Sequence, residues 1–215
     1  IFAASVVWIP AIDAEHPSRK FSAVKFIQIV DAFYISRIIG RCEAGFHLDV
    51  GVLGAKAILN ALSENGYPEV AYKVAAQDTY PSWGWWIVNG ATTLLENWDL
   101  KAERDISDNH MMFGEIGGWF YKGLGGIFPD PEQPGFKHIL LRPNFVKELK
   151  HFEAQHNSPY GQIISKWEWN RKKITYEVVV PANSTATLYL PDYVKGDKVI
   201  KLEAGKHSLV LNVSK

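Results

Sequence analysis

The sequence predicts an α+β chain in which helices come first and an antiparallel β-sandwich follows. Before residue 128 the apolar residues recur at helical spacing, and after about residue 137 they alternate with a period of two. Between these parts, the segment FPDPEQPG at 128–135 holds three prolines and a glycine, which predicts a linker or a wrapped surface loop. We therefore expect two domains, residues 1–127 and residues 128–215.

Composition limits the class of protein but does not name a function. The chain has 215 residues, of which 47% are hydrophobic, so a substantial core can form. Its formal net charge is zero, which argues against a nucleic-acid partner. Cys42 is the only cysteine, which excludes an internal disulfide and a cysteine-based zinc site. No apolar run reaches the length of a membrane span, and the compartment is left open by these features.

Helical periodicity places five helices in the first domain. They are expected at about 21–39, 52–63, 67–77, 83–88 and 110–124, and residues 91–98 are expected to form another turn or short helix. Asn65-Gly66 ends the second helix, and Pro68 suits the first turn of the third. Ser82 is expected to cap the fourth helix, and Asp108 or Asn109 the fifth.

The second domain reads as a series of short strands. Runs rich in β-branched residues lie at 138–143, 163–170, 173–181, 185–191 and 207–213, separated by turn residues. At least five such strands predict a sandwich. Trp167 and Trp169 are two residues apart and so share one face of their strand. They could form a sugar-binding platform, but core packing is the better interpretation.

The most informative stretch runs from Tyr80 to Tyr121. It contains five of the eight tryptophans in the chain, together with Glu96, Glu115 and His110. Tryptophan rarely clusters in this way without a functional role. Flat aromatic walls with a few polar groups between them are typical of sites that hold sugar rings. A carboxylate beside such walls can serve in proton transfer.

Three segments in and directly after this stretch carry a resemblance to a known family. They are YPSWGWW, GATTLLENWD and SDNHMMFGEIGGWFYKGLGGIFPDPEQPGF. From about His47 to Pro143 the chain resembles the end of the catalytic domain of bacterial α-L-rhamnosidases of glycoside hydrolase family 78. The resemblance implies that the helices are the last hairpins of an (α/α)6 toroid. It also implies that the whole enzyme is several times longer and that this chain is its C-terminal piece.

The resemblance gives Glu96 the role of general base. An inverting glycosidase needs one carboxylic acid to protonate the leaving oxygen and a second carboxylate to activate water. The family motif that resembles ATTLLENWD carries the base, so Glu96 inherits that role by position. The usual motif reads Trp-Glu-Arg-Trp, whereas this chain has Leu95, Glu96, Asn97 and Trp98. This departure affects the expected shape of the site more than the base itself.

The remaining expected site residues bind substrate. His110 resembles the sugar-contacting histidine of the family, and an imidazole can hydrogen-bond a hydroxyl from either nitrogen. Trp83, Trp86 and Trp98 are the candidates to line the same cleft, and core packing between helices is the alternative for at least one or two of the tryptophans. Glu115 is the alternative base, but it follows His110 by five residues and would point about 140° away around a helix.

These features together predict an α-L-rhamnosidase-like glycoside hydrolase that needs no metal or cofactor. The expected partners are a rhamnose-containing glycoside and the upstream domains of the same enzyme, and neither nucleic acid nor a membrane. The family's general acid lies far upstream, so the chain alone is expected to be inactive. Two alternatives stay open: a non-catalytic carbohydrate-binding module, and another (α/α)6 glycosidase of the trehalase-like or debranching kind.

Overall fold

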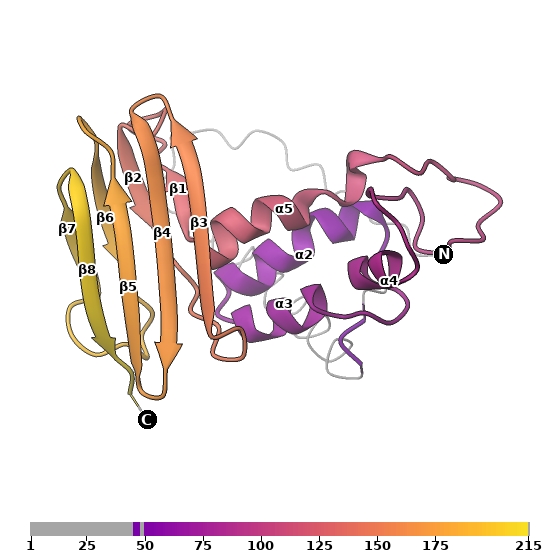
Figure 1. Cartoon of the computed structure of the whole chain (residues 1–215), viewed down its shortest axis with the longest axis horizontal. Helices are drawn as coiled ribbons and strands as arrows, with labels where there is room; N and C mark the ends of the chain where they lie inside the picture. The colour runs from indigo at the N-terminus through magenta and orange to yellow at the C-terminus, as the bar shows by residue number, and fades with distance from the viewer. Residues whose placement is uncertain (1–44, 48–49, 215) are drawn as a thin grey trace, which may run out of the picture. The chain divides into compact units, whose positions relative to one another are not determined.

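The computed structural model describes residues 45–47 and 50–214, all within one unit, Arg41–Lys215. Helices come first and two packed sheets follow, which confirms the predicted α+β class (Figure 1). The helix expected at 21–39 lies outside the described residues.

The first three described helices match the predicted periodicity closely. They are α2, Val52–Glu64; α3, Pro68–Ala75; and α4, Trp83–Val88. Their apolar faces bury Leu59, Leu62 and Val74 almost completely. Gly66, with φ of +87°, provides the left-handed turn after α2, a conformation that costs glycine little. Pro68 occupies the first turn of α3, where its missing N–H costs no helical hydrogen bond.

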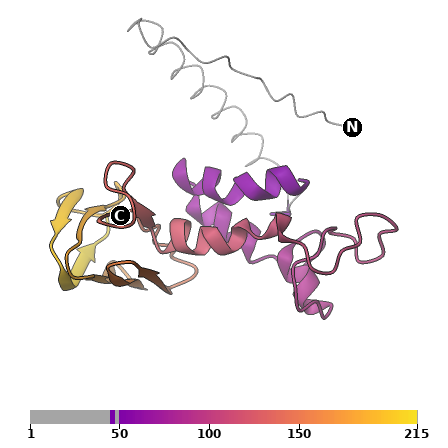
Figure 2. The same cartoon turned by 90° about the horizontal axis from the view of Figure 1, so that it is seen from above.

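The expected helix at 110–124 is present but is divided into three pieces. They are η1, Met111–Phe113; α5, Glu115–Trp119; and a π-helical turn η2, Phe120–Leu124. Helices α2 and α5 lie side by side in both views (Figure 1 and Figure 2). At Gly123 any side chain would collide with the Trp119 ring, because a Cβ there would lie 2.3 Å from Trp119 Nε1. The glycine thus lets the π-turn close over a buried indole.

Eight strands form the second part of the chain. Their bounds are β1, Ile127–Pro129; β2, His138–Leu141; β3, His151–Ser158; β4, Gly161–Asn170; β5, Lys173–Val180; β6, Thr185–Tyr189; β7, Val199–Leu202; and β8, Gly205–Asn212. Each of the five predicted runs contains a strand, and β1, β3 and β7 are additional. Strand β3 was not predicted because its sequence, HFEAQHNS, is mostly polar and contains no β-branched residue.

The strands make two four-stranded sheets in the orders β1-β2-β6-β7 and β3-β4-β5-β8. Every pairing in them is antiparallel except that of β2 with β6, which is parallel. Ile163, Trp167, Tyr176 and Leu188 are fully or almost fully buried. Burial raises the pKa of the Tyr176 hydroxyl, which lies 3.1 Å from Ser165 Oγ.

Polar contacts join the helices to the sandwich. Trp167 Nε1 donates to Leu124 O at 3.0 Å, and Ser165 Oγ donates to Gly125 O at 2.6 Å. Glu69 of α3 accepts from the Lys147 N–H at 2.8 Å. The first sheet begins at Ile127, but the domain boundary between residues 127 and 128 stays a prediction.

Every helix among residues 45–47 and 50–214 is too short or too polar to cross a lipid bilayer.

We predict that Trp167→Phe lowers the free energy of unfolding by about 1–3 kcal/mol, because it leaves the buried Leu124 carbonyl without a donor. Trp169→Phe is the matched control: that indole donates to Arg171 O in an exposed turn, where water can replace it. Chemical denaturation of the two variants measures the difference. Equal losses would contradict the idea that this indole bond joins the helices to the sandwich.

Candidate functional site

A cluster of aromatic rings joins α4, η1 and the loop that contains Trp98. Ser82 caps α4 as predicted, and its hydroxyl accepts the Trp85 N–H at 2.9 Å. Trp86 and Trp98 stack with centroids 4.5 Å apart, and Phe113 lies 4.3 Å from Trp98. Trp83 meets Trp98 edge to face at 5.4 Å. Such contacts add about 0.5–1.5 kcal/mol each to the burial of the rings.

The indole N–H groups of this cluster fix the loops around it. Trp86 Nε1 donates to the carbonyls of Asn97, at 3.1 Å, and Trp98, at 3.3 Å. Trp83 Nε1 donates to Phe113 O at 2.9 Å. Because a buried indole needs an acceptor, these bonds hold the irregular segment around Asn97 and the end of η1 at defined places.

Two of these segments run beside each other and carry the predicted polar residues. The Glu96 N–H donates to Ser107 O at 3.0 Å, and the His110 N–H donates to Leu94 O at 2.8 Å. Thr93 Oγ1 also donates to Asp108 O. This pairing brings Glu96 and His110 together although fourteen positions separate them in the sequence.

The two side chains face each other at a partly open surface. His110 Nε2 lies 3.7 Å from Glu96 Oε1, and the side chains are 29% and 26% exposed, respectively. The second carboxylate oxygen of Glu96 accepts the Ser107 N–H at 3.2 Å. The Glu96 carboxylate is therefore held from two sides while part of it stays accessible.

The tautomer of a neutral His110 follows from the contact that its Nδ1 atom makes at a helix start. Its Nδ1 accepts the Met112 N–H at 3.2 Å, which caps η1. The prediction that Asp108 or Asn109 provides this cap is wrong, because the imidazole makes the bond instead. A neutral imidazole that accepts at Nδ1 carries its proton at Nε2, the atom that faces Glu96.

Glu115 belongs to a different cluster of polar side chains. Its Oε1 accepts from Asn60 Nδ2 at 2.9 Å and lies 3.4 Å from Lys122 Nζ. The structure therefore pairs Glu115 with residues of α2 and η2, and Glu96 with Ser107 and His110.

The predicted aromatic substrate contacts are buried in the ring cluster rather than at a free surface. Trp83, Trp86 and Trp98 are 4%, 1% and 9% exposed, so their faces are covered by other rings. Their role as direct sugar contacts stays a prediction, and their geometry supports a role in holding the loops. Sequence reasoning missed Ser107, because a backbone donor leaves no signal in the residue type.

Among the residues that the structure describes, no three His, Cys, Asp or Glu side chains are placed to hold a metal ion. The Glu96–His110 pair brings together a carboxylate, an imidazole and a backbone N–H.

Two family models match most of the chain. Residues 36–124 match the bacterial α-L-rhamnosidase six-hairpin glycosidase domain, and residues 126–205 match the bacterial α-L-rhamnosidase C-terminal domain. The two matches meet where the last helical turn gives way to β1.

Individual relatives agree with the family models. An α-L-rhamnosidase of Formosa agariphila is 39% identical over 156 residues, which cover 69% of this chain and 17% of that protein. The structure of a Streptomyces avermitilis α-L-rhamnosidase complexed with L-rhamnose aligns with a TM-score of 0.69 and 29% identity, covering 84% of this chain and 19% of that one. An Aspergillus terreus α-L-rhamnosidase aligns with a TM-score of 0.76 and 25% identity, covering 84% and 22%. The chain thus spans about one fifth of the length of these relatives.

We predict that Trp86→Phe loosens the paired segments, because it removes the donor shared by two carbonyls of the Glu96 loop. Hydrogen exchange at the amides of Glu96 and Ser107 should accelerate, with a loss of about 1–3 kcal/mol in stability. Trp85→Phe is the control, since that ring packs edge-on against the exposed Tyr80. Unchanged exchange in Trp86→Phe would show that the ring packing alone holds the loop.

Proposed function

Because this chain belongs to the bacterial α-L-rhamnosidase family, we propose that it carries part of the active site of an enzyme that removes terminal α-L-rhamnose from rhamnosides. The chain is a piece of a rhamnosidase-like glycoside hydrolase, and the proposal concerns its mechanism and residues. One observation supports it above the others: Glu96 and His110 meet at 3.7 Å on a half-open surface backed by the tryptophan cluster.

In this proposal Glu96 is the general base of an inverting hydrolysis. The base must take a proton from the water that attacks the sugar from the face opposite the leaving group. Glu96 suits this step because its Ser107 contact orients the carboxylate and about a quarter of the side chain stays exposed. Water and substrate can therefore approach a carboxylate whose direction is already set.

His110 is proposed to position the sugar. Its Nδ1 is occupied by the Met112 N–H, so Nε2–H is the group that can donate to a sugar hydroxyl. A hydroxyl that bridges Nε2 and the carboxylate would lie beside the attacking water. Trp83, Trp86 and Trp98 shield this place from behind, and a direct stacking contact with sugar stays a prediction for them.

The proposal assigns the general acid to another part of the full-length enzyme. The family resemblance implies an acid upstream of the segments found here, and the matched regions cover only 17% and 19% of two of the relatives. We accordingly expect the isolated chain to show no turnover of rhamnosides.

We predict that Glu96→Gln in the full-length enzyme lowers kcat on an aryl rhamnoside by about 10²–10⁴-fold with little change in KM, since the lost group acts in the transition state. Glu115→Gln is the matched control, because this carboxylate has the same 26% exposure but lies in the Asn60–Lys122 cluster. Its kcat should stay within a few-fold of wild type. A larger loss in Glu115→Gln than in Glu96→Gln would assign the base to Glu115.

We predict that two substitutions at His110 distinguish the contribution of its Nδ1 cap from that of its Nε2 donor. Asn is a favoured N-cap residue, so His110→Asn should keep η1 capped while it removes the Nε2 donor. His110→Ala removes both. If His110 binds sugar, both variants raise KM to a similar extent, whereas His110→Ala alone loses stability, by about 1 kcal/mol. Normal KM in His110→Asn would mean that the residue acts only as a cap.

A further inference from the structure

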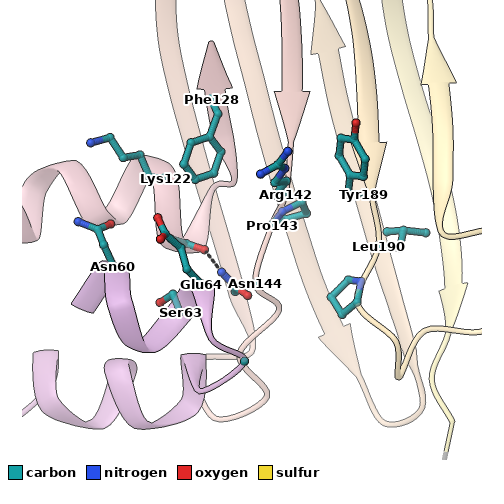
Figure 3. Close-up of a pocket in the computed structure, with 13 residues that line it drawn as sticks. Asn60, Ser63, Glu64, Lys122, Phe128, Arg142, Pro143, Asn144, Tyr189 and Leu190 are labelled. Carbon is teal, nitrogen blue, oxygen red and sulfur yellow. Dashed lines mark hydrogen bonds between the residues drawn. The ribbon is translucent and has the colours of Figure 1, made fainter. Parts of the chain in front are cut away.

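A pocket separate from the Glu96–His110 pair lies between helix α2 and the first sheet. Its volume is about 430 Å³, within the range of roughly 300–1,000 Å³ that is usual for small-molecule sites. Figure 3 shows side chains of α2 on one side of it and side chains from the ends of neighbouring strands on the other. We call it the α2–sandwich pocket.

The strand side of the pocket combines aromatic rings with a cation. Phe128 of β1 and Tyr189 of β6 both line it (Figure 3). The Arg142 guanidinium lies 4.9 Å from the Tyr189 ring centroid, which fixes its direction without using its N–H groups. Within the described part of the chain the guanidinium forms no hydrogen bond or ion pair. An arginine held in this way keeps its planar fork available for a carboxylate.

The helix side of the pocket is rich in hydrogen-bond acceptors. Asn60 and Asn144 each use their amide nitrogen within the protein, toward Glu115 Oε1 and Gly123 O, respectively. Their amide oxygens and the Glu64 carboxylate are therefore the groups left to accept from a ligand. These acceptors can receive hydrogen bonds from a ligand with several hydroxyl donors.

The charges at the pocket leave Arg142 as the cation that can pair with an anionic ligand. Arg142 and Lys122 contribute two positive charges, and Glu64 contributes one negative charge. Lys122 is shared with Glu115 at 3.4 Å, so Arg142 is the main cation for a bound anion. An inorganic anion such as sulfate can pair with Arg142 but has no hydroxyl groups to donate to the acceptors. A sugar acid can pair with Arg142 through its carboxylate and donate to the acceptors through its hydroxyl groups.

We propose that the α2–sandwich pocket is a binding site for a uronic acid, either free or as a unit of an oligosaccharide. The sugar carboxylate pairs with Arg142, the ring hydroxyls donate to Asn60, Asn144 and Glu64, and a ring face lies against Tyr189 or Phe128. The proposed site binds its ligand without catalysing a reaction, and it does not depend on the function proposed for Glu96.

Isothermal titration calorimetry of the full chain with D-glucuronate and D-glucose tests the site. The two sugars differ only in that D-glucuronate has a carboxylate where D-glucose has a hydroxymethyl group. D-Glucuronate should bind at least about tenfold more tightly than D-glucose, the effect expected of a charge-assisted hydrogen bond. Arg142→Gln should remove this preference. Arg171→Gln, at an exposed turn between β4 and β5, makes the same substitution outside the pocket and should leave the preference unchanged.

Three results would overturn the proposal. One is equal affinity for the two sugars. Another is equal behaviour of the Arg142→Gln and Arg171→Gln proteins. The third is sulfate binding as tight as that of D-glucuronate, which would reduce the pocket to a simple anion contact. Both substituted side chains are exposed, so thermal unfolding should show two folded proteins and a loss of binding can be assigned to the pocket.

Discussion

The structure depends on one constraint, which is that a buried indole must have an acceptor for its N–H group. Five tryptophans of the described chain are buried, and each donates to an atom distant in the sequence. The donor–acceptor pairs are Trp83 with Phe113 O, Trp86 with Asn97 O, Trp98 with Val50 O, Trp119 with Ser63 Oγ, and Trp167 with Leu124 O. Each ring thus contributes apolar burial and one directional contact.

This constraint explains how a site can form on segments without regular structure. Residues 91–110 contain neither helix nor strand, yet Glu96 and His110 lie on them at a defined separation. The loop is held from behind by Trp86, and its two halves are held to each other by the backbone contacts of Glu96 and His110. The Glu96 and His110 side chains can remain partly exposed because the buried Trp86 indole holds the backbone next to Glu96.

The sequence predicted the parts of this arrangement that depend on local pattern. Periodicity located α2, α3 and α4, and the residue type of Ser82 identified its cap. It could not predict β3, whose polar residues lie on an edge strand, or the cap formed by His110, because imidazole is an uncommon capping group. Whether a tryptophan faces a ligand or the core is decided by its tertiary neighbours, and these are absent from a single sequence.

Helix α2 connects the two candidate sites physically. The Trp98 indole donates to the carbonyl of Val50, just before the first turn of α2. The Trp119 indole donates to Ser63 Oγ in the last turn of α2. Asn60 on the same helix lines the α2–sandwich pocket. Thirteen helical residues span about 20 Å, and any sliding of α2 would break a buried indole bond at a cost of about 1–3 kcal/mol. The spacing between the Glu96 loop and the pocket is therefore set by the fold and not by a ligand.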